Sequence, residues 1–290
     1  MPYDPQNQDN PPDKKSIFGV IVHSFFVIPF LLAIFSVLLF VSVRILTMEK
    51  RDVNDYLEDV NTGGLTKRWQ SAFELSRILS NHQVVPQDKK FIHNMISAYE
   101  KSKNDDDRVR QYLALAMGRS GIQDFVDVLI KAALEEKNEN LYAIVTGLGI
   151  LHNEKAIPVL LNILNDDNAH IRLAAVIALG NIGHPSTITP LRQVLNDPEP
   201  NVSWDAAIAL AKMGDRSGKA VILNLLNRRY LDRFAHISPQ DQSRMMMVAI
   251  SSTSSWHDPD IENILKGLFV NDRNMNVRDL AHRVLGKHNV

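Results

Sequence analysis

The sequence predicts an all-α solenoid that follows one membrane-spanning helix. Three observations support this fold class: a phrase that recurs about every 31 residues, apolar residues at helical spacing without a strand pattern, and one long uncharged segment near the N-terminus. A fixed period of this size is typical of repeat proteins, in which each unit buries its apolar face only against its neighbours. Such an extended fold favours a binding function.

Each repeat is defined by one anchor position near the start of its first helix. The first four anchors are 31 residues apart, and the next two follow at intervals of 41 and 34 residues. A small residue stands nine positions after each anchor, and an arginine follows directly after several of them. The anchors are Val109, Asn140, Ile171, Val202, Ser243 and Val277; the arginines are Arg110, Arg172, Arg244 and Arg278.

The N-terminal part predicts a tail and an anchor. Residues 1–15 are rich in Pro, Asn and Asp and predict a disordered tail. Residues 16–45 predict a transmembrane helix, because Ser16–Val43 runs for 28 residues without Asp, Glu, Lys or Arg. A helix needs only about 20 apolar residues to cross a bilayer. No small-residue cleavage site follows, which predicts an uncleaved, single-pass anchor in the cell membrane.

The basic residues on either side of this segment predict its orientation. Lys14 and Lys15 precede it, whereas Arg44, Lys50 and Arg51 follow it. Basic residues near a span favour the cytoplasmic side. We therefore expect the repeat domain to lie in the cytoplasm.

Residues 46–64 predict a juxtamembrane amphipathic helix. Its apolar residues follow a 3, 4, 7 spacing and share one face: Val53, Tyr56, Leu57 and Val60. The Asn-Thr-Gly-Gly sequence at 61–64 ends it. Because the end of a solenoid needs a cap, we expect this helix to pack on the first repeat.

Residues 65–290 predict the repeat domain. The first helix pair, at 66–79 and 89–99, is irregular, and regular units begin at Arg108. Pro158 and Pro190 fall in the first turn of second helices, where the missing N–H costs no hydrogen bond.

The fullest copy of the phrase runs from Asp166 to Gly183 and reads DDNAHIRLAAVIALGNIG. It resembles the HEAT repeat, in the short form named after the phycobilisome lyases. The resemblance covers about residues 105–286, with a degenerate leading unit at 64–103. It implies a right-handed solenoid of HEAT-like helix pairs. Together with the predicted span, the solenoid predicts a membrane-anchored scaffold or adaptor that binds another protein, and we expect that partner to be associated with the membrane.

Several function classes find no support in the sequence. A net charge of −1 argues against nucleic-acid binding, and the absence of cysteine excludes thiolate catalysis and cysteine-based zinc sites. HEAT-like deoxyhypusine hydroxylases bind iron through His-Glu pairs, but no histidine here precedes a glutamate. We predict no catalytic residue, no cofactor, no metal and no small-molecule substrate. A lyase-like enzyme or enzyme accessory subunit is the alternative.

One row of first-helix residues predicts a protein-binding ridge. The position two residues after the anchor points away from the packed face of the helix, at about 100° per residue. It is apolar in four consecutive units, and the position five residues after the anchor is apolar beside it. Exposed apolar ridges usually mark interaction sites. The alternative is that another element of the chain covers the ridge, either the insertion at 227–242 or the juxtamembrane helix. The ridge comprises Tyr142, Leu173, Trp204 and Met245.

An insertion at 227–242 lengthens one interval and carries Arg229 and Arg233. Placed four residues apart on a helix, these arginines would share one face. They predict a contact with an acidic partner or with lipid headgroups, and a solvated helix face is the alternative.

Overall fold

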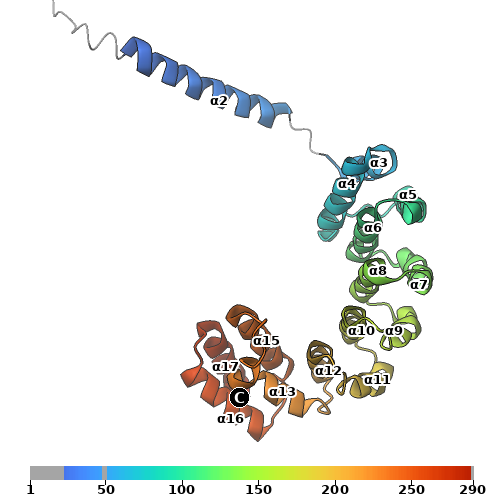
Figure 1. Cartoon of the computed structure of the whole chain (residues 1–290), viewed down its shortest axis with the longest axis vertical. Coiled ribbons are helices and arrows are strands. Elements are labelled where there is room, and N and C mark those ends of the chain that lie inside the picture. The colour runs from blue at the N-terminus through green and yellow to red at the C-terminus, as the bar shows by residue number, and fades with distance from the viewer. Residues whose placement is uncertain (1–22, 48–50, 289–290) are drawn as a thin grey trace, which may run out of the picture. The chain divides into compact units, whose positions relative to one another are not determined.

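The computed structural model describes residues 23–47 and 51–288. The chain divides into two compact units, Met1–Arg51 and Asp52–Val290 (Figure 1). Within the described residues there are helices, turns and bends but no strand, which confirms the all-α prediction. The predicted tail at 1–15 and the first seven residues of the predicted span, 16–22, lie outside the described residues.

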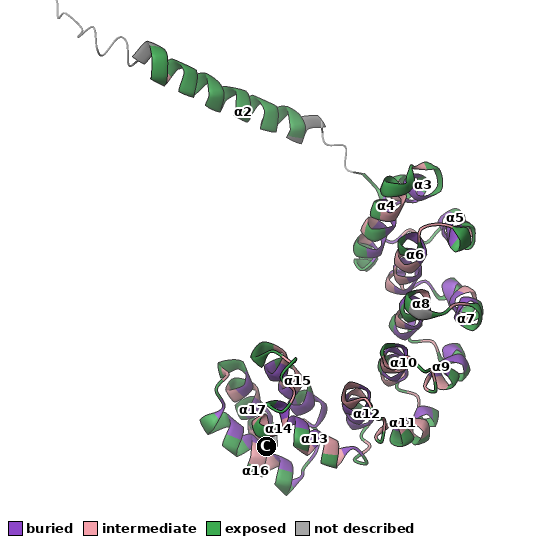
Figure 2. Ribbon diagram, in the orientation of Figure 1, coloured by how far each residue is buried: buried purple, intermediate pink, exposed green. Residues whose placement is uncertain are grey.

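The first unit contains one long helix. A π-helical turn, η1 (His23–Val27), leads into α2 (Ile28–Thr47). The stretch Phe25–Arg44 has a mean hydropathy of 2.8, and none of it is buried within the protein (Figure 2). By length and composition this helix can cross a bilayer, because about 20 residues suffice.

The second unit is a solenoid of helix pairs in two layers (Figure 1). The first helices of the pairs are α4 (Leu65–Ile78), α6 (Asp107–Ser120), α8 (Asn138–Leu151), α10 (Ala169–Ile182) and α12 (Pro200–Lys212). The second helices are α5 (Lys89–Lys101), α7 (Val126–Glu135), α9 (Ile157–Ile163), α11 (Ile188–Val194) and α13 (Lys219–Leu225). The C-terminal part adds α14 (Arg228–Leu231), α15 (Pro239–Ser252), α16 (Pro259–Asn271) and α17 (Met275–His288). The predicted solenoid is thereby confirmed.

Helix α3 (Val53–Thr62) closes the N-terminal end of the solenoid. Asp52 caps it, since its carboxylate accepts the Asp55 amide at 2.9 Å while the Asp55 carboxylate accepts the Asp52 amide at 2.8 Å. The amphipathic face buries Val53, Leu57 and Val60. This face packs on α4 and α5, so α3 covers apolar surface that an end repeat would otherwise expose.

Neighbouring first helices approach closely at the small residue nine positions after each anchor. A Cβ atom added to Gly118 would lie 2.4 Å from the Cα atom of Gly147, and one added to Gly149 would lie 2.8 Å from the Cα atom of Ala178. No side chain fits into either space. The glycines of the repeat phrase therefore set the spacing between repeats.

Left-handed residues end several first helices. Gly121 and Gly183 have φ values of +72° and +65°, which glycine adopts without a steric penalty. His152 holds the equivalent place after α8 with φ +52°, and is the only non-glycine residue with positive φ in the described chain. The turn from α8 into the next helix thus carries backbone strain.

Four arginines link successive turns, and we name this set the arginine ladder. Each guanidinium forms an ion pair with an acid in a later turn: Arg68–Asp105, Arg110–Glu136, Arg172–Asp197 and Arg228–Asp272. The first three also donate to backbone carbonyls at or before the start of their own helix, those of Val60, Tyr99 and Asp166. These four arginines therefore tie several turns to a later one along one edge of the solenoid.

Burial corrects the register of one repeat. In α15 the buried residues Gln242, Met246, Ala249 and Ile250 follow the anchor spacing 0, 4, 7 and 8. The anchor is therefore Gln242 rather than Ser243, and the intervals become 40 and 35 residues. Arg244 consequently lies outside the ladder, where it is exposed and pairs with Asp241. The sequence predicted the wrong register for this repeat for two reasons. Gln242 is polar whereas most anchors are apolar, and the insertion changes the interval between anchors.

Two apolar core clusters meet at α12. Val202, Ala206 and Leu210 belong to the core of the preceding repeats, whereas Trp204 and Ala207 belong to the core of the C-terminal part. Helix α12 is thus a wall shared by both cores.

Candidate protein-binding site

The predicted ridge divides into an accessible half and a covered half. Tyr142 on α8 is 43% exposed, and Leu173 on α10 is partly buried beside it. Trp204 is only 3% exposed. The ridge is therefore not continuous, which corrects the expectation of four exposed residues in a row.

Tyr142 and Leu173 lie on one apolar groove between α8 and α10, which we name the α8–α10 groove. It has a volume of about 120 Å³. The exposed apolar side chains Ile150 and Ile177 line it together with the ridge residues. The remaining lining residues are Thr146, Gly149, Ala174, Ala178 and Asn181.

The floor of the groove follows from the glycine spacing described above. Gly149 and Ala178 have no side chain large enough to fill the space between the helices. The Thr146 hydroxyl donates to the Tyr142 carbonyl at 2.8 Å, so its polar group is satisfied within α8. What remains accessible is mainly hydrocarbon and the Tyr142 ring, a combination that suits an apolar side chain of a protein partner.

The row five positions after the anchor is buried, contrary to the expectation that it lies beside the ridge. Val145, Val176 and Ala207 are all 0% exposed. These residues belong to the two apolar cores of the solenoid rather than to its surface. Val248, counted from the corrected anchor, does not belong to this row and is 42% exposed.

The insertion covers Trp204. Phe234 packs edge-on against the indole with ring centroids 4.8 Å apart, and Tyr230 lies at 6.2 Å. The Trp204 Nε1–H group donates to the Tyr230 hydroxyl at 3.2 Å. Trp204 is therefore a core residue, and Met245, displaced by one residue in the corrected register, packs partly against the same C-terminal core.

The two arginines of the insertion do not share a helix face. Helix α14 ends at Leu231, so Arg229 lies on it and Arg233 lies beyond it. Both side chains are exposed. The Arg233 guanidinium lies 4.4 Å from the centre of the Tyr230 ring. The two arginines therefore do not form the single basic helix face that the sequence predicted. Any contact with an acidic partner would involve each arginine separately.

Asp205 is a titratable group that the sequence analysis missed. It stands three residues after the anchor in α12, where α8 and α10 carry the buried alanines Ala143 and Ala174. Burial raises the pKa of the Asp205 carboxyl to about 6, although the charge of Lys212 acts in the opposite direction. An acid at a position that is apolar or aromatic in the other regular units was the available signal.

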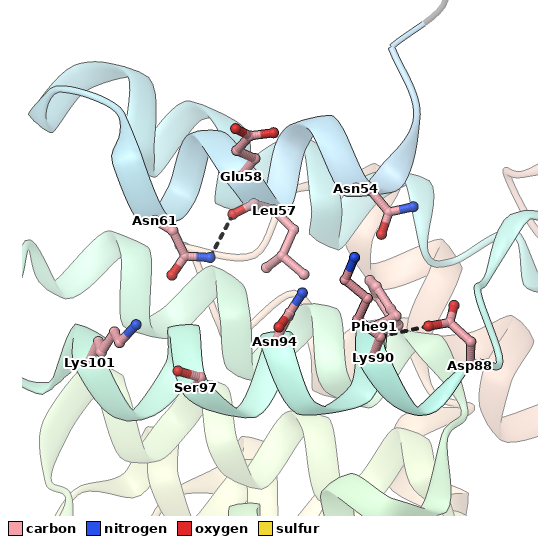
Figure 3. Close-up of a pocket in the computed structure, with 10 residues that line it drawn as sticks. All are labelled: Asn54, Leu57, Glu58, Asn61, Asp88, Lys90, Phe91, Asn94, Ser97 and Lys101. Carbon is pink, nitrogen blue, oxygen red and sulfur yellow. Dashed lines mark hydrogen bonds between the residues drawn. The ribbon is translucent and has the colours of Figure 1, made fainter.

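A second, polar groove lies between α3 and α5 (Figure 3). It has a volume of about 520 Å³ and carries both signs of charge, with Glu58 and Asp88 against Lys90 and Lys101. Some of its polar groups are already used, because the Asp88 carboxylate accepts the Phe91 amide at 2.9 Å. Across the described residues no group of three or more His, Cys, Asp or Glu could hold a metal ion.

Comparison with known proteins identifies the repeat. The family model described as HEAT repeats matches residues 97–176 and 157–237. The chain is similar to a solved structure of the complex of CpcE and CpcF of phycocyanin lyase from Nostoc sp. PCC7120, with 16% identity and a TM-score of 0.55 over 83% of this chain and 96% of that one. No curated protein matches the sequence.

Two further solved structures are similar over 82% of this chain. One is the designed armadillo repeat protein YIII(Dq)4CqI, of which 100% is covered at 15% identity and a TM-score of 0.40. The other is human deoxyhypusine hydroxylase in complex with glycerol, of which 96% is covered at 14% identity and a TM-score of 0.34.

Proposed function

Because this chain is a HEAT-repeat protein, we propose that it is a membrane-anchored scaffold that binds another protein through its first helices. The observation that supports this most directly is the α8–α10 groove. Tyr142, Ile150 and Ile177 expose apolar surface there, between helices whose other faces are packed into the core. Apolar side chains clustered on an accessible groove are typical of protein-binding sites.

Helix α2 supplies the anchor in this proposal. An uncovered helix with a mean hydropathy of 2.8 is unfavourable in water and favourable in a bilayer. The basic residues Arg44, Lys50 and Arg51 favour the cytoplasm for the repeats. Anchoring would confine the solenoid to the membrane surface, where a partner at the same membrane is encountered at high local concentration.

Site-specific photocrosslinking tests the binding site. A photoreactive phenylalanine derivative would replace Tyr142 in the full-length protein in membranes, and irradiation should yield a discrete adduct with a second protein. His93, which is exposed on the second helix α5, is the matched control position. An adduct that an Ile177→Asp change abolishes supports the proposal. Equal adducts at both positions, or none at Tyr142, would contradict it.

Fractionation and a reporter test the anchor separately. The full-length protein should remain with membranes after alkaline carbonate washing. A C-terminal fusion to an enzyme that is active only outside the cytoplasm should be silent. Release by carbonate would reject the anchor, whereas an active reporter would reverse the orientation and leave the anchor intact.

The alternative function is a lyase-like subunit. The likeness to the phycocyanin lyase complex favours it, although at 16% identity that likeness shows the fold alone. In this case the chain would bind phycocyanin. Mixing purified full-length protein with phycocyanin subunits and measuring co-elution distinguishes the two functions, because the scaffold proposal predicts no complex.

A further inference from the structure

The arginine ladder has a gap. Turns before five first helices carry an acid four or five residues ahead of the anchor: Asp105, Glu136, Asp166, Asp197 and Asp272. Four of these acids pair with an arginine from elsewhere in the chain. At Asp166 the position that should supply the arginine, directly after the anchor of α8, is Leu141.

A groove lies at this gap, between the turn that precedes α8 and the turn that precedes α10, and we name it the Leu141 slot. Its volume is about 480 Å³, against about 170 Å³ for the groove that Arg110 lines one repeat earlier. One Asp166 oxygen accepts the Asn168 amide at 2.8 Å. Among the described residues no lysine or arginine side chain forms an ion pair with the Asp166 carboxylate. Arg172 donates to the Asp166 backbone carbonyl and acts on the carboxylate only at longer range, and Lys137, which also lines the groove, is exposed.

The lining of the Leu141 slot matches the two ends of an arginine side chain. Leu141, Ile163 and Ile171 are buried and form an apolar wall, against which the methylene stem of arginine can pack. Asp166 and Asp167 stand at the polar end of the slot. A carboxylate there can accept two hydrogen bonds from a planar guanidinium, as the two Asp197 oxygens do from Arg172.

The same chain shows that such a gap is filled from outside the repeat. In the α15 unit the position after the anchor is Ser243, which cannot reach Asp272 as an arginine would. Arg228 of the insertion occupies that place instead, with hydrogen bonds of 2.9 and 2.8 Å to the Asp272 carboxylate and 3.0 Å to the Ser243 hydroxyl. An arginine need not belong to the repeat itself to complete the ladder.

From these observations we infer that the Leu141 slot binds an arginine side chain presented by a partner protein. The partner's guanidinium pairs with Asp166, and its stem packs on Leu141 and Ile171. Lysine is the poorer occupant, because its ammonium group cannot form the paired hydrogen bonds of the guanidinium fork. This inference names one binding site of the proposed scaffold. It rests on the proposed function in one respect, that the ligand is a protein.

Peptide selection on the full-length protein in nanodiscs tests the inference. The probes are short display-library peptides with random flanks and a fixed central residue, either arginine, lysine or glutamine. The competing variants are Leu141→Arg, which fills the slot from within, and Asp166→Asn, which removes the charge but keeps a hydrogen-bond acceptor. Asp127→Asn is the matched control, because Asp127 is a 73% exposed acid outside the slot.

The inference predicts that peptides with a central arginine are enriched. Both slot variants should lower the affinity for these peptides about tenfold or more, and the control variant should leave it unchanged. Equal enrichment of arginine and glutamine peptides would overturn it, as would binding that Asp166→Asn leaves unchanged. The Ile177→Asp variant separates the two proposals. It should abolish the crosslink at Tyr142 and leave the selection of arginine peptides unchanged, because Ile177 lines the α8–α10 groove and not the Leu141 slot. A wild-type protein that selects arginine peptides but gives no adduct at Tyr142 would reject only the α8–α10 groove. A wild-type protein that gives the adduct but shows no preference for arginine would reject only the slot.

Discussion

The Arg172 guanidinium donates two hydrogen bonds to the Asp197 carboxylate, at 2.8 and 2.9 Å, across 25 residues of sequence. Both side chains are nearly buried, with 13% and 9% exposed. Arg172 also donates to the Asp166 carbonyl at 2.9 Å. One side chain therefore fastens the turn before α10 to the turn before α12.

Replacing Arg172 by methionine should strongly destabilise the repeats. Burial acts to raise the pKa of the Asp197 carboxyl, but hydrogen bonds from Arg172 and the Glu199 amide outweigh it and hold the pKa below its ordinary value. The variant would leave this carboxylate buried without its cation, at a cost of about 3 kcal/mol. Denaturant unfolding followed by circular dichroism measures the change.

The pH dependence of this pair has a definite sign. Because the folded pKa of Asp197 is lowered, its stabilisation is present above the ordinary aspartate pKa and is lost as the pH falls through the folded pKa. Arg172→Met should therefore cost least in strong acid. Arg283→Ala, which breaks an exposed pair with Asp279, should cost about 0.5 kcal/mol or less and is the control. Similar losses in both variants would contradict a special role for the ladder.

Asp205→Asn should stabilise the protein at neutral pH. Because burial raises the folded pKa of Asp205 to about 6, the wild type loses stability as the pH rises from the ordinary aspartate range through 6. Removing the titratable group should increase the free energy of unfolding by about 2 kcal/mol above pH 7 and by little in acid. Unfolding curves of both proteins across this pH range measure it. A gain that is independent of pH would mean that the carboxylate is not the cause.

Trp204→Ala should lower the melting temperature sharply. The indole is 3% exposed and packs against Tyr230 and Phe234, so its removal leaves a cavity that costs about 3–5 kcal/mol. Tyr142→Ala removes a ring that is 43% exposed and should cost about 1 kcal/mol or less. Differential scanning fluorimetry of the two variants separates a core tryptophan from an accessible tyrosine. Equal shifts would show that the insertion does not cover Trp204.

His152→Gly should stabilise the turn after α8. The backbone there has φ +52°, which costs a side-chain-bearing residue about 1 kcal/mol relative to glycine. His184→Gly is the control, because His184 has φ −77° and caps the following turn through its ring nitrogen. That variant should be destabilised. Thermal unfolding of both variants checks the opposite signs.

The solenoid could be predicted from the sequence because its period is visible at two positions of each unit, the anchor and the small residue nine positions later. Val109, Ile171 and Val277 are buried as anchors, and the glycines nine residues later are where helices meet. The α15 register was missed because Gln242 is a polar anchor. The covering of Trp204 by the insertion was an open alternative in the sequence, because it depends on how residues 227–242 fold back, a long-range contact that no periodicity encodes.

The arginine ladder itself shows the same limit. The arginines after several anchors were visible in the sequence, but the pairing of Arg110 and Arg172 with the turn of the following unit was not. Arg68 and Arg228 belong to the ladder although they fall outside the regular phrase, since only the fold brings them to Asp105 and Asp272.

The reach of each arginine into the following unit bears on how such an array lengthens over evolution. A duplicated unit of the α10 type would arrive with its own arginine and its own turn acid, and so would join the array without leaving either charge unmatched. Duplicating the α8 unit would instead add another acid without an arginine, and with it another vacant place on the same edge. Duplication of the α10 unit would therefore keep every charge on this edge paired within the protein. Duplication of the α8 unit would add further grooves that the side chains of other proteins could occupy.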